Sequence, residues 1–485
     1  MTRKLYFSLF ILYVCFFIKA QTVPAIKHFI NNPYMKGASF SLIIKDINQQ
    51  KTFYSYDSGR LLTPASVMKS ITTASALELL GEDFKFSTTI EYDGTIVNGI
   101  LKGNLYIKGS GDPTLGSKHF GENTKRFMTQ WINAIQKAGI HKIEGNIIAD
   151  ESIFDIEGTS LKWANEDMGN YYGAGSYGIC VFDNSYTLAL QSGAAGTRPK
   201  IKGTDPNIPN LHFHNYLSSA SIASDSAFIS GAPFSTERYL HGAIPANRTW
   251  YPLKGDIPDP ALFLADYMKR QLANQGISTT GIASCFRLLK EKGKWTNSKH
   301  NKLITTYSPT LRNIIKETNH ISHNLFADAI IRTIGLRYKP QKGEIISSFN
   351  RGTKMITSFW EKKGIDVSGI WIHDGSGLAP ANKLSADFVA NILTYMKKHS
   401  QHNAAFYESL PEAGINGSVR NFLKGTVLQG KARLKSGSMS RVKGYAGYIQ
   451  YNGKSYAIAL FVNNYSCDGS TINQALKKLL LQLFQ

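Results

Sequence analysis

Strand-like alternation at both ends of the chain limits the folds that this sequence can adopt. Residues 38–45 and 51–56 alternate apolar and polar side chains on either side of a turn-rich stretch, as the strands of an antiparallel hairpin do. Three more strands are predicted near the C-terminus, at residues 432–435, 444–451 and 454–463, with an Asn-Gly turn joining the last two. We therefore expect both ends of the chain to share one antiparallel sheet.

Helical patterns lie beside these strands in the sequence. A stretch rich in Ala and Leu predicts a helix over residues 66–80. Helix-period patterns return at residues 308–336, 343–363 and 385–398, and an amphipathic pattern at residues 470–484 ends the chain. The sequence thus predicts an α+β fold in which helices flank the antiparallel sheet.

The segment between these parts has a different pattern. Residues 86–295 contain short strand-like runs, Asp-Gly and Asn-Gly turns, and one helix-like stretch at residues 124–137. We expect a large, mainly β inserted region of one or two domains. Residues 21–85 and 296–485 are then the two parts of a single surrounding domain.

The first twenty residues have the pattern of a secretory signal peptide. Arg3 and Lys4 precede an apolar run at residues 5–18, and Ala20 is a small residue suited to cleavage. This run is short for a membrane span, and no later stretch reaches about 18 apolar residues. We predict that residues 1–20 are removed and that the mature protein is exported to a periplasm or cell envelope.

The charge balance bears on the partners of the protein. The sequence has 55 Lys and Arg residues against 34 Asp and Glu, a net charge of +21. The basic residues are scattered, without an RNA-binding aromatic motif or zinc-finger spacing, so no nucleic-acid partner is expected. The charge instead suits an anionic envelope surface, which allows peripheral association with a membrane.

A Ser-x-x-Lys motif places a nucleophile near a base. Ser66 and Lys69 lie three residues apart at the start of the first predicted helix, where the amine reaches the hydroxyl. A serine hydroxyl needs a base, and a lysine acts as that base when burial and neighbouring positive charge depress its pKa. Because Ser440 and Lys443 have the same spacing, this motif alone does not identify a site.

Two further motifs follow in a required order. Ser322-His323-Asn324 lies between predicted helices, and Lys435-Ser436-Gly437 lies on a predicted strand. The ordered set of three motifs resembles the penicillin-recognising serine acyl-transferases. Each motif also has the expected context, namely a helix start, a loop between helices and a strand beside a hairpin.

The long separation between the first two motifs narrows the resemblance. Between Lys69 and Ser322 lie the 252 residues 70–321, which include the inserted region. In this respect the chain resembles the penicillin-binding protein 4 class of D-alanyl-D-alanine carboxypeptidases/endopeptidases, and further matches to that class lie at residues 103–113, 374–378 and 410–414. The resemblance implies a DD-peptidase/β-lactamase-like fold, with the surrounding domain as the catalytic domain.

The resemblance also implies roles for the motif residues. Ser66 corresponds to the acylated nucleophile and Lys69 to its base. Ser322 and Asn324 correspond to residues that relay protons and position the substrate amide. Lys435 corresponds to a residue that raises the local positive potential.

The remaining implied roles concern substrate binding. Ser436 and Gly437 belong to the segment that holds the terminal carboxylate, and the backbone amide of Ser438, with that of the nucleophile, corresponds to the oxyanion site. Asp167 is a candidate specificity residue for the amine of a diamino acid; the alternative is a solvated surface carboxylate. His323 stands where Asp is common in the family.

Taken together, the resemblance implies a serine DD-peptidase that hydrolyses D-Ala-D-Ala bonds or D-Ala–diamino acid cross-links of peptidoglycan stem peptides through an acyl-enzyme. β-Lactam antibiotics are then its covalent inhibitors. The alternatives are a β-lactamase or esterase of the same superfamily, disfavoured by the long insert, and a non-catalytic peptidoglycan-binding protein, disfavoured by the intact motifs. No cofactor is implied. No metal site is predicted, because the Cys spacing is unsuitable and His212 and His214 lack a third ligand at regular spacing.

Overall fold

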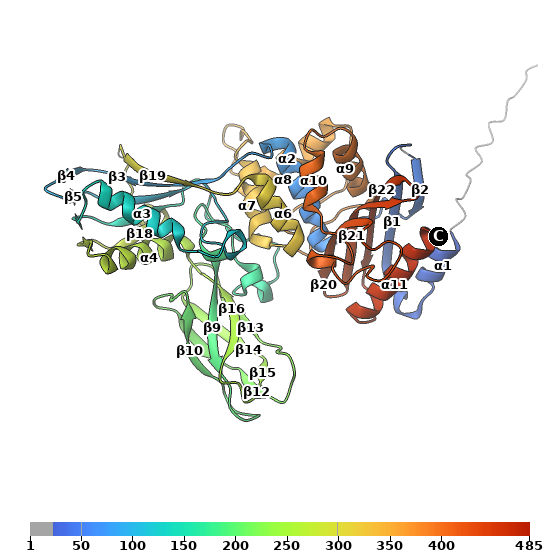
Figure 1. Ribbon diagram of the computed structural model, residues 1–485, viewed down its shortest axis with the longest axis horizontal. Coiled ribbons are helices and arrows are strands. Elements are labelled where there is room, and N and C mark those ends of the chain that lie inside the picture. The colour runs from blue at the N-terminus through green and yellow to red at the C-terminus, as the bar shows by residue number, and fades with distance from the viewer. Residues whose placement is uncertain (1–22, 50, 298) are drawn as a thin grey trace, which may run out of the picture.

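The computed structural model describes residues 23–49, 51–297 and 299–485 (Figure 1). The predicted signal peptide, residues 1–20, lies outside the described residues. One side of the molecule is built from both ends of the chain, and the inserted region extends away from it. Within the described part of the chain, no helix has both the length and the apolar character needed to cross a membrane.

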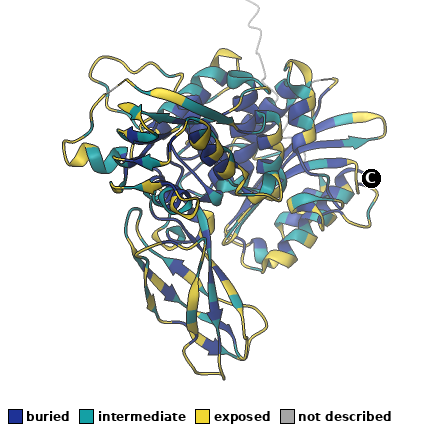
Figure 2. Ribbon diagram, turned by 60° about the vertical axis from the view of Figure 1, so that its left-hand side comes forward, coloured by how far each residue is buried: buried dark blue, intermediate teal, exposed yellow. Residues whose placement is uncertain are grey.

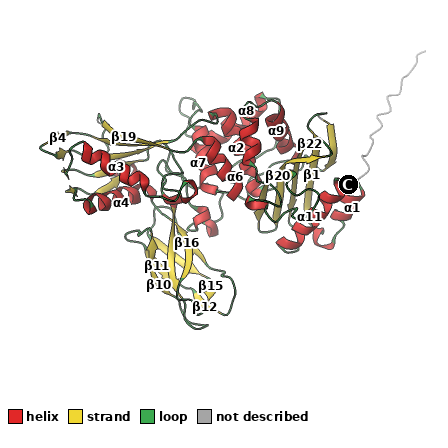
Figure 3. Ribbon diagram, viewed as in Figure 1, coloured by secondary structure: helices red, strands yellow, loops and turns green. Residues whose placement is uncertain are grey.

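Both ends of the chain form one five-stranded antiparallel sheet, as predicted. The first strand of the chain pairs along its whole length with the last, from Ser39 opposite Asn463 to Asp46 opposite Tyr456. These two central strands are largely buried, because helices cover both faces of the sheet (Figure 3). The strand order is β2 (Lys51–Tyr56), β1 (Ser39–Asp46), β22 (Lys454–Asn463), β21 (Val442–Tyr451) and β20 (Ala432–Met439).

The helices form two layers around this sheet. On one face, α1 (Pro24–Ile30) and α11 (Gly469–Leu483) share an apolar cluster with alternate side chains of β1 and β22. The other face meets a helical group in which α2 is buried from Met68 to Leu77 (Figure 2). This group consists of α2 (Met68–Leu80), α6 (Leu311–Ile321), α7 (Asn324–Gly335), α8 (Ser348–Lys362), α9 (Ala386–Lys398) and α10 (Asn403–Ser409).

The inserted region begins with an α/β part. Its last strand, β19, pairs with β3 so that Thr306 lies opposite Thr88. The inserted sheet therefore continues to Tyr307, which corrects the predicted boundary at residue 295; pairing between distant strands has no local sequence signal. The main sheet has the order β18 (Ala283–Cys285), β8 (Ile147–Asp150), β6 (Leu105–Gly109), β3 (Ser87–Tyr92) and β19 (Asn301–Tyr307). A smaller sheet has the order β17 (Ser278–Thr279), β7 (Lys142–Ile143), β5 (Ile100–Lys102) and β4 (Thr95–Val97).

Three helices belong to this α/β part, of which the sequence predicted only the first, α3 (Arg126–Lys137). The missed helices are α4 (Pro260–Asn274) and α5 (Phe286–Glu291). The start of α4 is well formed, since the Asp259 side chain accepts a hydrogen bond from the Leu262 N–H and a proline occupies the first helical position. The Gly and Pro residues around this helix favoured a β prediction for the whole segment.

The rest of the insert is a β part that projects from the molecule (Figure 1). A single apolar cluster runs through both parts of the insert, so the two parts pack against each other. The strands form three small sheets, with the orders β10 (Lys200–Asp205), β9 (Ser185–Gln191), β16 (Tyr251–Asp256); β11 (His212–Asn215), β14 (Glu237–His241), β13 (Phe228–Ser230); and β12 (Ser218–Ala220), β15 (Ala243–Pro245).

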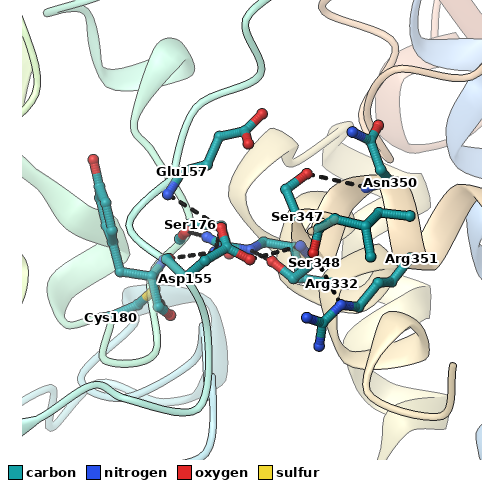
Figure 4. A network of polar contacts seen from close by, with 11 residues as sticks. Asp155, Glu157, Ser176, Cys180, Arg332, Ser347, Ser348, Asn350 and Arg351 are labelled. Atoms are coloured by element: carbon teal, nitrogen blue, oxygen red, sulfur yellow. Dashed lines mark hydrogen bonds and ion pairs between the residues drawn. The ribbon is translucent and has the colours of Figure 1, made fainter. Parts of the chain in front are cut away.

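A buried polar network fixes the insert against α7 and α8 (Figure 4). The guanidinium of Arg332 on α7 donates to Ser348 Oγ at 2.7 Å and to the carbonyl oxygen of Asp155, in the insert, at 2.8 Å. It also donates to the carbonyl oxygen of Ser176, and the Ser348 N–H donates to Asp155 Oδ2 at 2.6 Å. Because the Arg332 guanidinium is fully buried, these charge-assisted bonds hold the insert in a defined place beside α7 and α8.

Candidate active site

Ser66 and Lys69 meet at the start of α2. Ser66 lies in a short 3-10 turn, η2 (Ala65–Val67), which leads directly into the helix. The Nζ atom of Lys69 is 3.0 Å from Ser66 Oγ and donates a hydrogen bond to it. Lys69 is fully buried, whereas Ser66 remains partly exposed. The predicted pair is therefore in contact, with its hydroxyl open to a substrate.

The Lys69 amine is held by three acceptors. Besides Ser66 Oγ, it donates to Asn324 Oδ1 at 2.7 Å and to the carbonyl oxygen of Ser376 at 2.6 Å. Burial lowers the pKa of Lys69 to about 8, although the Asp328 and Asp374 carboxylates oppose this shift. With this pKa, about a tenth of the amine is neutral at pH 7 and able to accept a proton.

A second buried lysine faces the second motif. Ser322 ends α6 in a left-handed conformation, with φ of 62°. Lys435 on β20 donates to Ser322 Oγ at 3.0 Å and to the carbonyl oxygen of Ser436 at 2.7 Å. Burial lowers the pKa of Lys435 well below its usual value, and the charges of Lys69 and Lys443 add to the shift. The two lysines thus create a positive, desolvated environment around two serine hydroxyls.

Asn324 connects this site to the insert. Its Oδ1 accepts from Lys69, while its Nδ2 donates to the carbonyl oxygen of Tyr172 at 2.8 Å. Asp167, in the 3-10 turn η4 (Asn165–Asp167), interacts with the Tyr172 side chain. Burial raises the pKa of Asp167, and burial together with Asp167 raises the pKa of Tyr172 to about 12. Asp167 is therefore connected to Lys69 through two residues, Tyr172 and Asn324.

Strand β20 passes directly beside Ser66. A Cβ atom on Gly437 would lie 2.4 Å from the Pro64 carbonyl oxygen and 3.2 Å from the Ser66 nitrogen. Only glycine permits so close an approach. Ser436 Oγ lies 2.8 Å from Ser418 Oγ, and the next residues of the strand lead to the exposed Ser438. The three motifs, far apart in the sequence, therefore meet in one place.

In this site a serine hydroxyl lies beside an amine whose pKa is lowered, and a second lysine and serine lie opposite them. This is the chemistry of acyl transfer. The profile of the D-Ala-D-Ala carboxypeptidase 3 (S13) family matches residues 23–483. The chain belongs to this family. The predicted resemblance and the predicted serine D-Ala-D-Ala carboxypeptidase are thus confirmed.

Individual S13 relatives and structures agree with this assignment. The D-alanyl-D-alanine carboxypeptidase DacB of Haemophilus influenzae is 25% identical over 437 residues, which cover 89% of this chain and 86% of the relative. A D-alanyl-D-alanine carboxypeptidase of Actinomadura sp. is 24% identical over 448 residues, which cover 90% and 80%. The crystal structure of penicillin-binding protein 4 from Haemophilus influenzae has a TM-score of 0.80 and 22% identity, covering 96% of this chain and 100% of that one. The shared fold confirms the predicted fold class.

Two buried carboxylates of this S13 site had no role assigned from the sequence. Asp374 accepts from the Trp163 indole at 2.8 Å and from backbone N–H groups of its own loop. Asp328 Oδ1 accepts from the N–H groups of Gly375 and Ser376, at 2.8 and 3.0 Å, and so fixes the carbonyl that holds Lys69. A lone Asp within the apolar helix α7 is a sequence signal that could have identified Asp328. The Ser376 carbonyl that holds Lys69 has no such signal, because every residue has a backbone carbonyl.

Proposed function

We propose that this S13 peptidase cleaves its substrate through an acyl-enzyme on Ser66. The observation that carries the proposal is the buried Lys69 amine, 3.0 Å from Ser66 Oγ and with a pKa of about 8. In its neutral form this amine takes the hydroxyl proton while Oγ attacks the carbonyl carbon of the penultimate D-Ala. The nucleophile and its base therefore need no other group for the first proton transfer.

The remaining steps use the groups around this pair. As the C–O bond forms, the oxyanion is stabilised by the backbone N–H groups of Ser66 and Ser438. The C–N bond then breaks, and the proton on Lys69 reaches the leaving amine through the Ser322 hydroxyl, which Lys435 holds at 3.0 Å. Water then attacks the ester carbonyl carbon while Lys69 accepts its proton. The bond between Ser66 Oγ and the carbonyl carbon breaks, Lys69 returns the proton to Oγ, and the shortened peptide leaves with a free carboxyl group.

We assign substrate binding to the adjacent segments. Lys435 and Ser436 face the terminal carboxylate of the stem peptide, and Asn324 orients the scissile amide. Asp167 meets the amine of the diamino acid, which extends the substrates to D-Ala–diamino acid cross-links of peptidoglycan. A β-lactam offers a similar carbonyl and carboxylate, and the related Haemophilus influenzae penicillin-binding protein 4 has been crystallised with one.

We also propose that the protein is exported. The pattern of residues 1–20 supports a cleaved signal peptide, and a peptidoglycan substrate requires a periplasmic or cell-envelope location. Removal of residues 1–20 takes away Arg3, Lys4 and Lys19 and leaves a net charge of +18, which favours contact with carboxylate-rich wall peptides and with anionic membrane surfaces.

The experiment that tests the proposal is intact-mass measurement of the mature protein after brief incubation with benzylpenicillin. We expect one long-lived adduct, located on Ser66 by peptide mapping. The Ser66→Ala variant should form none, whereas the matched Ser440→Ala variant should react like the wild type. Release of D-Ala from a stem pentapeptide is then measured on the same three proteins.

The other outcomes separate the alternatives. Rapid penicillin hydrolysis without an adduct or D-Ala release identifies a β-lactamase. Tight muropeptide binding that survives Ser66→Ala, without an adduct or product from the wild type, identifies a non-catalytic binding protein. Either result rejects the proposed DD-peptidase.

A further inference from the structure

Two histidines and an aspartate converge beside the active site. His119 and Asp183 come from the insert, and His323 is the middle residue of the second motif. One ligand atom from each of the three, an imidazole nitrogen or a carboxylate oxygen, lies within 4.8 Å of the other two. The residues line a cavity of about 290 Å³ that Ser322 and Asn324 also line. The cluster thus spans the junction between the insert and the catalytic domain.

The distances within the cluster leave space for an ion. Asp183 Oδ1 is 3.8 Å from His323 Nε2, and Asp183 Oδ2 is 3.9 Å from His119 Nε2. Both separations are too long for hydrogen bonds. Bonds of about 2.0–2.1 Å to a tetrahedral ion place neighbouring ligand atoms about 3.3–3.4 Å apart. Small side-chain movements therefore bring the three groups to bonding distance.

The aspartate of this cluster lacks a partner for one oxygen. Asp183 is 7% exposed, and its Oδ1 has no hydrogen-bond partner among the residues that the structure describes. Its position is fixed by interactions with the Ser117 side chain and the Lys118 backbone. A buried carboxylate oxygen without a partner is unfavourable, and a bound cation supplies the missing interaction.

Both histidine rings are oriented by neighbours outside the cluster. His119 Nδ1 is 3.5 Å from Glu317 Oε1, which leaves Nε2 facing Asp183. A carboxylate behind a histidine is the usual arrangement around metal-ligating imidazoles. The His323 ring stacks on Phe326, with centroids 3.8 Å apart and an interplanar angle of 14°. Neither ring needs a large rotation to act as a ligand.

We propose that His119, Asp183 and His323 bind a zinc ion, with water as the fourth ligand. Two imidazole nitrogens and one carboxylate oxygen form a ligand set that suits zinc. Lys118 and Lys254 line the same cavity, so their positive charges make the site bind zinc less tightly than an acidic site would. The ion links the insert to the segment that carries the second motif. Residues so distant in the sequence form no spacing pattern, which is why the sequence predicted no metal.

The test is a calorimetric titration of the chelator-treated full chain with Zn²⁺. We expect one zinc per chain, and cobalt substitution should produce the visible absorption of a four-coordinate ion. His119→Ala and Asp183→Asn should each weaken zinc binding at least about tenfold, and Glu317→Gln about tenfold through the lost orientation of His119. The matched control is His214→Ala, which removes an exposed histidine 2.6 Å from Glu237 and should leave zinc binding unchanged.

Three results would overturn the proposal: no zinc bound by the wild type, unchanged affinity in Asp183→Asn, or loss of binding in His214→Ala. Circular dichroism identifies any variant that fails to fold. If His119→Ala is such a variant, Glu317→Gln decides, since weaker binding there supports the site and unchanged binding rejects it. A zinc-dependent rise in the Tm of the wild type, smaller in Glu317→Gln, is the independent readout. None of these measurements depends on peptidase activity.

Discussion

The Ser-x-x-Lys pattern occurs twice in the chain, in two different structural settings. Ser66 and Lys69 lie on a helix start, where residues three apart share a face. Ser440 lies in the turn between β20 and β21, and Lys443 lies on β21. This segment is not helical, so the geometry that brings residues three apart onto one face of a helix is absent there. A motif of this kind therefore indicates chemistry only when its secondary structure is known.

The surroundings of the two lysines differ as well. Burial lowers the pKa of both Lys69 and Lys443, so a depressed pKa does not separate them. Lys69 has a serine hydroxyl 3.0 Å away. Lys443 instead lies over the Tyr445 ring, 5.5 Å from its centroid, and adds positive charge near Lys435. A lowered pKa therefore does not by itself make a lysine a base. The amine must also contact the group whose proton it accepts.

The strongest test of this contrast removes each amine in turn. Lys69→Met should lower the rate of penicillin acylation at Ser66 by about 10³-fold or more, since among the described residues no other base contacts the hydroxyl. Lys443→Met should have a far smaller effect, because it removes only a neighbouring charge. Intact-mass time courses measure both rates. Equal losses in the two variants would contradict the assignment of Lys69 as the base.

A second test displaces strand β20 from Ser66 and Lys69. In Gly437→Ala, the new methyl group meets the Pro64 carbonyl oxygen at 2.4 Å, so the strand must shift away from Ser66. We expect acylation to slow by about 100-fold, as misplacement by about 1 Å can do. Gly59→Ala is the matched control, since a Cβ there meets nothing within 4 Å. Normal acylation in Gly437→Ala would show that this strand is not needed at the nucleophile.

The pH dependence of acylation gives a third, smaller effect. Protonated Lys69 cannot accept a proton, so the rate should rise with pH and level off above its pKa of about 8. Below that value each pH unit should cost about tenfold. The midpoint should be the same in Lys443→Met, which is measured over the same pH range. A midpoint that shifts or disappears in Lys443→Met would instead identify Lys443 as the base.

The smallest expected effect concerns the insert, whose Tyr172 contacts Asn324 beside Lys69. Asp167→Asn should reduce kcat/KM for a stem peptide with a free diamino-acid amine by about fivefold, the range of a partly exposed ion pair. The loss should be smaller for the same peptide with its amine acetylated, because that amide carries no charge. Initial rates of D-Ala release from the two peptides provide the comparison. Unchanged rates for both peptides would make Asp167 an ordinary surface carboxylate, and equal losses would show that it does not recognise the amine.

Much of the fold could be predicted because its signals are local. The alternation in β1 and β22 and the helical period in α2 arise from a few successive side chains, and all three elements formed. The end of the insert could not be placed this way, since β19 is defined by pairing with a strand more than 200 residues earlier. Helix α4 was missed because flanking Gly and Pro residues masked its period.

The active-site residues divide in the same way, into those with a local sequence signal and those without one. Side chains that act through their own chemistry, such as Ser66 and Lys69, have a sequence pattern. Tyr172 and Ser376 act through backbone carbonyl oxygens, which every residue has, so no residue type marks them. The zinc ligands proposed above escape detection for a related reason, because their proximity arises only from the packing of the insert against the second motif.

The pairing of β1 with β22 has a consequence for biosynthesis. Residues 39–46 cannot form their backbone hydrogen bonds to residues 456–463 until the latter have been synthesised. The two buried lysines likewise come together only after residues 70–434 have been synthesised. Late-forming contacts of this kind slow folding. A nascent chain that has not reached residue 435 therefore lacks the second buried lysine, and the site cannot be complete before that residue is synthesised.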